Sequence, residues 1–295
     1  MRLLHISDTH GYAEGSNDAV AVASSMGVQL VHTGDMVHDY FQQGVDYLNM
    51  DAIWPVLGNH DTINQSGTDP AGYHWHDKPS QADLRARYFD GYPARGLVFP
   101  SADATWWHRD VDGCRVIGLD ITALGNDLTK QLTWLSSTLN TMPTLVLSHI
   151  GPRGLHYTPN SFTNMSYWGD PSQYDPNTDA VYPAIAQLSS TVFSHAELYN
   201  VPMCMLCGHE HADGIIVHKG VPIVTVGSVV QDKWNNVYRS TSHDTSRLVA
   251  NLVTFNKTGV TVQRLGADGR TTGSRAKMWA YSYAEKRVTA VISGR

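Results

Sequence analysis

The chain has 295 residues and a formal net charge of −6, and 42% of its residues are hydrophobic against 16% charged. This composition is that of a globular protein and excludes a disordered chain. It supplies no broad basic field, so neither an acidic membrane nor a long nucleic acid is the favoured partner. A nucleic-acid partner would need a local basic patch.

The sequence also bears on the compartment. No stretch approaches the roughly 18 apolar residues of a membrane span, and the first residues lack the apolar segment of a secretory signal. Three cysteines, Cys114, Cys204 and Cys207, are too few for a disulfide framework in a chain of this size. We therefore expect a cytoplasmic protein.

The first part of the chain predicts a β-α-β unit. Residues 2–7 (RLLHIS) form a short apolar run typical of a buried strand, and residues 17–27 place small apolar side chains at helical spacing before a glycine. Residues 28–35 form a second strand that runs into Gly-Asp. The parallel strands of such a unit direct their carboxyl ends to one edge of the sheet. Residues 52–61 repeat the strand pattern, although Pro55 donates no hydrogen bond to a sheet.

The rest of the chain alternates strands and helices around two irregular, aromatic-rich insertions. These cover residues 62–112, with one predicted helix at 80–89, and residues 151–179. The patterns predict strands at 114–120, 143–149 and 201–211, helices at 128–140 and 180–200, and short strands with a hairpin over 213–265. We interpret residues 1–269 as one domain and residues 270–295 as a basic C-terminal extension or peripheral strand.

Polar residues able to bind metal follow five of the apolar runs. They are Asp8 and His10, Asp35, Asn59 and His60, His149, and His209 and His211. In an open α/β sheet, ligands bind outside the carboxyl ends of the strands, so we expect these side chains to converge on one crevice. Carboxylate, imidazole and amide oxygen suit Mn²⁺, Fe or Zn²⁺, and the set is large enough for two ions.

The order of these motifs resembles the calcineurin-like metallophosphoesterase family. The blocks read Asp-x-His, Gly-Asp, Gly-Asn-His-Asp, a single His and Gly-His-x-His, and the resemblance covers residues 1–230. It implies an α/β fold, a four-layer α/β/β/α sandwich of two mixed sheets flanked by helices. It also implies an enzyme that hydrolyses phosphate esters with two divalent metal ions per chain, of which Mn is preferred over Fe or Zn.

The resemblance also assigns roles to individual residues. It implies that Asp8, His10 and His211 hold the first ion, that Asn59, His149 and His209 hold the second, and that Asp35 bridges both. His60 would bind the substrate phosphate and act as a general acid, oriented by Asp61. A hydroxide bridging the two ions would attack phosphorus directly.

The activity within the family stays open at this point. We prefer a phosphodiesterase acting on a small phosphate ester, because the acidic charge disfavours long nucleic acids. A phosphomonoesterase, including a protein phosphatase, and a nuclease are alternatives. A metal-bearing scaffold or binding component of a larger assembly is an alternative of another class. The oligomeric state is not readable from the sequence.

Several residues have both a functional and a structural interpretation. Trp75, His76 and Arg153 in the insertions are candidates for substrate contact, as is the Trp106-Trp107 pair, but aromatic residues of irregular segments also pack loops onto a core. His5 and His32 lie within apolar strands, which favours hydrogen-bonded core histidines over ligands.

Two local patterns are also ambiguous. Many family members read Gly-Asp-x-x-Asp where residues 34–39 read GDMVHD, so His38 either supports the site or lies at the surface. Cys204 and Cys207 have the CxxC spacing of a zinc or redox pair, but we favour two buried cysteines of a strand.

Overall fold

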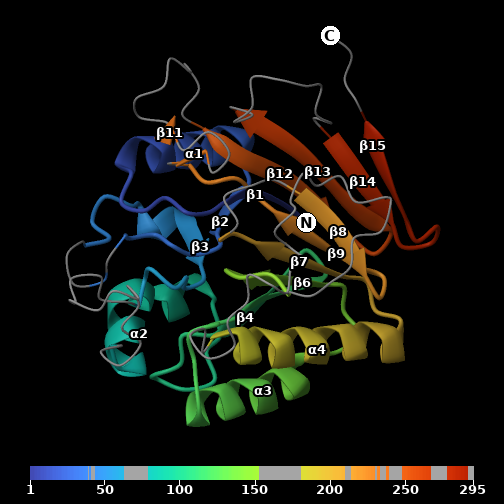
Figure 1. Ribbon diagram of the computed structural model, residues 1–295, viewed down its shortest axis with the longest axis horizontal. Coiled ribbons are helices and arrows are strands. Elements are labelled where there is room, and N and C mark those ends of the chain that lie inside the picture. The colour runs from blue at the N-terminus through green and yellow to red at the C-terminus, as the bar shows by residue number, and fades with distance from the viewer. Residues whose placement is uncertain are drawn as a thin grey trace.

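The computed structural model describes residues 1–38, 40, 44–62, 79–152, 181–209, 214–229, 231–232, 237–238, 248–266 and 278–291. Two mixed β-sheets are stacked between helices, with α1 (Ala13–Met26) on the outer side of one sheet and α3 (Asn126–Thr138) and α4 (Val181–Tyr199) below the other (Figure 1). The predicted four-layer α/β/β/α sandwich is confirmed.

The first sheet has seven strands in the order β15-β14-β13-β12-β1-β2-β3. Its parallel part consists of β1 (Arg2–Ile6), β2 (Gln29–His32) and β3 (Ile53–Pro55). Its antiparallel part consists of β12 (Val249–Phe255), β13 (Gly259–Gly266), β14 (Met278–Ser282) and β15 (Arg287–Val291). Residues 278–291 of the predicted C-terminal extension thus form the two strands at one edge of this sheet.

The second sheet has six strands in the order β4-β5-β6-β7-β9-β8. They are β4 (Trp107–Val111), β5 (Cys114–Gly118), β6 (Thr144–Ser148), β7 (Met203–Cys207), β8 (Gly214–His218) and β9 (Val221–Thr225). Strands β5, β6, β7 and β9 are parallel, and β4 and β8 pair antiparallel to β5 and β9. A separate short ladder joins β10 (Gln231–Asp232) to β11 (Val237–Tyr238).

Strand β7 shows how the core is divided. Cys204 and Leu206 point into the core between the two sheets. Met203, Met205 and Cys207 point into the core between the second sheet and helices α3 and α4. Successive side chains of a strand alternate between its faces, so two cysteines three positions apart lie on opposite faces. Both are buried and neither forms a disulfide, which confirms the interpretation as buried strand residues. Their opposite orientations argue against a zinc or redox pair.

The predicted elements are confirmed with shifted ends. Helix α1 begins at Ala13 rather than at residue 17, because the loop after β1 is short and Ser16 donates to the carbonyl of Tyr12 from inside the first turn. Strand β3 ends at Pro55. The predicted helix at 80–89 is α2 (Gln81–Phe89), which is capped by the Ser80 side chain.

Two short 3₁₀ helices complete the described elements, at Met50–Ala52 and Tyr92–Arg95. Strand β4 was not expected, because it lies within the first predicted insertion. Among the described residues, no helix combines the length and the hydropathy that a membrane-spanning segment needs.

Candidate metal centre

The candidate residues follow the carboxyl ends of parallel strands from both sheets. Asp8 and His10 follow β1, Asp35 follows β2, Asn59 and His60 follow β3, His149 follows β6 and His209 follows β7. Hydrogen bonds join the first two loops, since the N–H of Asp8 donates to the carbonyl of Gly34 (3.0 Å) and that of His10 to the carbonyl of Asp35 (2.9 Å). The parallel topology thereby brings these side chains to one edge of the sandwich.

Asp35 lies at the middle of this group. Its Oδ2 is 3.2 Å from Nε2 of His149 and 3.8 Å from Nε2 of His10, and its Oδ1 accepts a 2.8 Å hydrogen bond from the backbone N–H of His60. Burial opposes ionisation of this carboxyl, but the neighbouring imidazoles, above all His149, hold its pKa well below the ordinary value. Asp35 is therefore a buried carboxylate between two imidazoles.

Asn59 forms a second point of convergence. Its Oδ1 lies 3.0 Å from Nε2 of His149 and 3.1 Å from Nδ1 of His209. The backbone N–H of His209 donates to Oδ2 of Asp8 at 3.0 Å, which ties the loop after β7 to the loop after β1. Donor atoms from both sheets thus surround a common space.

The tautomer of His149 is fixed by its backbone partner. Nδ1 donates a 2.6 Å hydrogen bond to the carbonyl of Thr33, so Nε2 is the nitrogen directed at Asp35 and Asn59. Burial disfavours a charge on this ring, but the negative charge of Asp35 outweighs it and raises the pKa of His149 to about 9. This position therefore favours positive charge.

The donor set fits divalent ions. Nε2 of a neutral His149 has a lone pair, and it faces one carboxylate oxygen and one amide oxygen. Three lone-pair atoms so close together are favourable only around a cation or a proton. Two of the groups of described residues whose ligand atoms lie within 4.8 Å of one another contain Asp35, namely Asp35, His149 and His209, and Asp8, His10 and Asp35. Mixed oxygen and imidazole donors are suited to borderline divalent metals.

Glycines make room for these donors. A Cβ atom on Gly34 would lie 2.6 Å from Nδ1 of His149, and one on Gly208 would lie 2.8 Å from Oδ2 of Asp8. A Cβ atom on Gly58 would lie 2.9 Å from Cγ of Asp35 and closer still to Oδ1. Real Cβ atoms do not approach other atoms so closely, so any other residue at these three positions would displace a candidate ligand.

The backbone at the site is strained. Asp8 (φ 56°), His10 (φ 45°), Asp35 (φ 54°) and His209 (φ 66°) all adopt the left-handed conformation that side chains rarely occupy. Such residues cluster at functional sites, where the surrounding structure holds the strain. Aspartate and histidine tolerate this conformation better than most residues, so the residue types also fit the turns that carry them.

A family model described as calcineurin-like phosphoesterase matches residues 1–213. The chain belongs to this family. No curated protein matches the chain significantly.

Solved structures similar to this calcineurin-like phosphoesterase are distant. A predicted phosphoesterase of Streptococcus pneumoniae is 13% identical with a TM-score of 0.40, over 95% of this chain and 97% of that one. The phosphopantetheinyl hydrolase of Mycobacterium tuberculosis is 16% identical with a TM-score of 0.40, over 77% and 89%. A Vps29 double mutant from Entamoeba histolytica is 12% identical with a TM-score of 0.36, over 99% of each chain. The family assignment therefore rests on the sequence match.

Asp61 has a different surrounding from the expected one. Its carboxylate accepts hydrogen bonds from the backbone N–H groups of Val37 (3.0 Å) and Gly58 (2.8 Å). Burial and the nearby charge of Asp35 raise its pKa to about 7. Nδ1 of His60 instead donates to the carbonyl of His38 at 2.8 Å. In this calcineurin-like phosphoesterase, Asp61 thus fixes the loops after β2 and β3, and the carbonyl of His38 orients His60.

The two strand histidines are core residues, as expected. His5 Nε2 lies 2.9 Å from Oγ1 of Thr33, and His32 Nε2 lies 3.0 Å from Oγ1 of Thr9. The N–H of Gly34 also donates to Nδ1 of His32 at 3.2 Å. Burial lowers the pKa of both histidines to about 3, which keeps them neutral. Their hydrogen bonds hold the strand ends that carry Asp8 and Asp35.

Several predicted site residues lie outside the described residues, namely His211, Arg153, Trp75 and His76. The other aromatic candidates pack in the core instead of facing the site. Trp106 and Trp107 are both buried, and Nε1 of Trp107 donates to the carbonyl of Pro55 at 2.9 Å. The packing interpretation of this pair is confirmed.

Two contributors to the site were not expected from the sequence. The carbonyl of Thr33 sets the tautomer of His149, and a backbone carbonyl leaves no signal in a sequence. Ser228 donates from Oγ to the carbonyl of Asp8 at 2.9 Å. It follows β9, so a polar residue after a further parallel strand was a readable signal.

Proposed function

We propose that this calcineurin-like phosphoesterase hydrolyses small phosphodiesters at a centre of two divalent ions. The observation that carries the proposal is the position of Asp35, whose Oδ2 faces His10 and His149. These imidazoles belong to the two ligand groups that the family resemblance implies. A carboxylate between them is suited to bridging two ions.

The remaining donors complete the two groups. Asp8 and His10 would hold the first ion together with His211, and Asn59, His149 and His209 would hold the second. Divalent ions there, with Mn²⁺ as our preferred metal, would supply neutralisation of the phosphate oxygens and activation of water at neutral pH. The neutral, hydrogen-bonded His32 and the backbone-bound Asp61 keep the loops that carry these donors in place.

His60 is the group that we assign to the leaving oxygen. Its Nδ1 is occupied by the carbonyl of His38, so Nε2 is the nitrogen that can bind substrate and transfer a proton. His60 is only partly buried. An alkoxide leaving group needs such a proton far more than an activated phenolate does.

The size and charge of the substrate follow from the chain as a whole. A net charge of −6 repels a long polyanion, whereas a small diester carries a single negative charge. We therefore prefer small diesters over nucleic acids as substrates. We also propose a cytoplasmic location, which the three buried cysteines support because none of them forms a disulfide.

The test is hydrolysis of a chromogenic aryl phosphodiester and of the matching monoester by metal-stripped protein, with and without Mn²⁺. The test variant is Asp35→Asn. The control is Asp112→Asn, because Asp112 is an exposed aspartate in the same left-handed conformation (φ 51° against 54°). Mn²⁺-dependent diester hydrolysis in the wild type and the control, but not in Asp35→Asn, supports the proposal.

Two results would contradict it. A preference for the monoester would make the protein a phosphomonoesterase. No turnover of either ester despite two bound ions per chain would favour the scaffold or binding role instead.

A further inference from the structure

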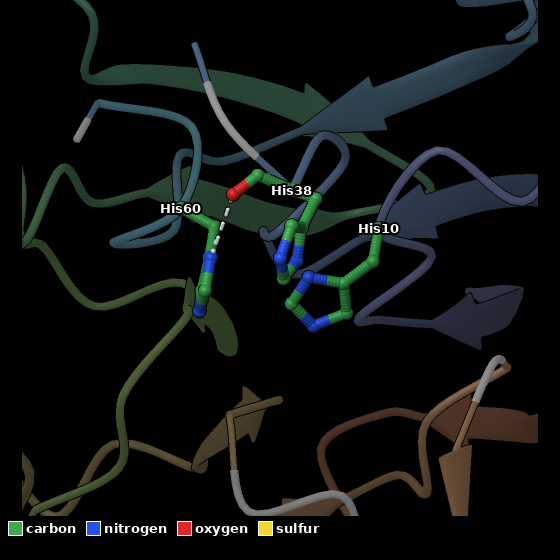
Figure 2. A group of neighbouring side chains, drawn as sticks. All are labelled: His10, His38 and His60. Atoms are coloured by element: carbon green, nitrogen blue, oxygen red, sulfur yellow. Dashed lines mark hydrogen bonds between the residues drawn. The ribbon is translucent and has the colours of Figure 1, made fainter. Parts of the chain in front are cut away.

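Three imidazoles meet at the mouth of the candidate centre. The rings of His38 and His60 are stacked, with centroids 5.2 Å apart and planes 20° apart, and His10 meets both edge-on at 5.6 and 4.7 Å. Figure 2 shows the three rings side by side, with the hydrogen bond from His60 to the backbone of His38. We call these residues the histidine trio. The proposed function uses His10 and His60 but assigns no task to the side chain of His38.

His38 departs from the Gly-Asp-x-x-Asp pattern. It stands at the position where the Gly-Asp-x-x-Asp pattern has a carboxylate, so an imidazole replaces an oxygen donor there. The side chain is exposed, unlike the buried Asp35 three residues before it. The exposed imidazole therefore adds a third nitrogen donor beside those of His10 and His60.

We propose that the histidine trio is an additional binding site for a borderline transition metal such as Zn²⁺, and that an ion bound there inhibits hydrolysis. One nitrogen of each ring lies within 4.8 Å of the others. Three imidazole ligands with an open position are an established arrangement for zinc, at Zn–N distances of about 2.0–2.1 Å. At these Zn–N distances the ligand nitrogens of a tetrahedral site lie about 3.4 Å apart, so all three rings must close in on the ion.

The donor chemistry separates the trio from the centre described above. The trio offers only imidazole nitrogen, whereas the groups around Asp35 combine imidazole with carboxylate and amide oxygen. Imidazole suits Zn²⁺, Cu²⁺ and Ni²⁺, whereas oxygen donors shift the preference toward Mn²⁺. We therefore expect the trio to prefer Zn²⁺, Cu²⁺ and Ni²⁺ over Mn²⁺ more strongly than the centre around Asp35 does.

An ion in the trio would inhibit hydrolysis because the trio uses two residues of the proposed centre, His10 and His60. This part of the inference rests on the proposed function. Nδ1 of His60 is committed to the carbonyl of His38, so both a metal ion in the trio and the leaving group need Nε2. Nε2 of His10 also faces Asp35 at 3.8 Å, so an ion in the trio lies beside the centre and competes with the first ion for the single lone pair of the neutral His10 ring. Occupation of the trio and proton donation by His60 therefore exclude each other.

The binding test uses full-length, metal-stripped protein and Zn²⁺ as the probe. The variant is His38→Ala, and the control is His218→Ala, which removes a partly buried imidazole that contacts Phe193 on the far side of the second sheet. Metal analysis after gel filtration should find about one Zn²⁺ fewer per chain in His38→Ala than in the wild type and the control. The ¹⁵N resonances of the His38 imidazole should shift on Zn²⁺ addition. Equal Zn²⁺ content and affinity in all three proteins would overturn the site.

The inhibition test measures Mn²⁺-dependent hydrolysis of the aryl diester against rising Zn²⁺. The wild type and His218→Ala should be inhibited in the concentration range of the additional site, and His38→Ala should need about 10-fold more Zn²⁺ or higher. Equal inhibition of all three proteins would refute the regulatory role. Absence of hydrolysis in every protein would instead contradict the proposed function, and the Zn²⁺ content would still decide whether the trio binds metal.

Discussion

Gly58→Ala tests whether space beside Asp35 is required for metal binding. The added Cβ would lie 2.9 Å from Cγ of Asp35 and closer still to Oδ1 and to the backbone nitrogen. Ordinary contacts of a Cβ atom begin near 3.4 Å. Both residues are buried, and the N–H of Gly58 donates to Asp61, so the loop cannot simply move outward. The backbone of Asp35 must therefore shift together with its carboxylate.

The expected magnitude has two components. Overpacking of a well-packed interior costs about 1–3 kcal/mol, which we expect as a loss of stability in the metal-free variant. The second component is the stabilisation by bound metal, about 2.7 kcal/mol for one site at a metal concentration 100 times the Kd. The variant should lose most of this gain, because the displaced carboxylate is the proposed bridge.

The assay is urea denaturation of metal-stripped protein with and without Mn²⁺. Gly118→Ala is the matched control, because its Cβ would lie 2.8 Å from Cζ2 of the buried Trp107, in a strand away from the donors. Both variants should be destabilised without metal, and only Gly118→Ala should keep the gain from Mn²⁺. A full Mn²⁺ gain in Gly58→Ala, or its loss in both variants, would refute the reasoning.

Three further predictions follow from the same geometry. His60→Ala should reduce kcat/KM modestly on an activated aryl diester and much more on an alkyl diester, and equal losses would exclude the acid role. The pKa values of His5 and His32 are about 3 in the folded protein against 6.5 ordinarily. The two neutral histidines therefore contribute fully to the free energy of unfolding above pH 6.5. This contribution falls as the pH is lowered toward 3, by about 1.4 kcal/mol per pH unit for each histidine. Urea denaturation at pH 7, 6 and 5 should show this slope, and His5→Gln should make it shallower; a flat profile would show that neither ring stays neutral. Chelation by EDTA should lower the Tm of the wild type and not that of Asp35→Asn, and equal lowering would place the metal elsewhere.

The convergence of the candidate site was predictable, because it follows from parallel strands rather than from side-chain detail. Polar residues after β1, β2, β3, β6 and β7 must reach one edge once these strands run parallel in two stacked sheets. The four layers follow from the same alternation of strands and helices. Both results rest on short apolar runs whose ends are marked by Gly, Asp and His.

The contacts between loops could not be predicted in the same way. The partner of His60 is the carbonyl of His38, and the partners of Asp61 are two backbone N–H groups. Backbone groups are the same at every residue, so the sequence contains no information on which of them faces a given side chain. The stacking of His38 on His60 likewise depends on how two separate loops are placed.

Four residues with a strained backbone lie at the strand ends of the candidate site. Asp8, His10, Asp35 and His209 adopt a backbone conformation that costs of the order of 1–3 kcal/mol at a residue with a side chain. The same loops enclose the buried carboxylate of Asp35, whose pKa is lowered, and the buried imidazole of His149, whose pKa is raised. A sequence selected for stability alone would avoid both features. Cations bound at the proposed centre would offset both, because they would neutralise the carboxylate and hold the donors in the strained turns. The unstable part of the fold is therefore the part that metal binding is expected to stabilise.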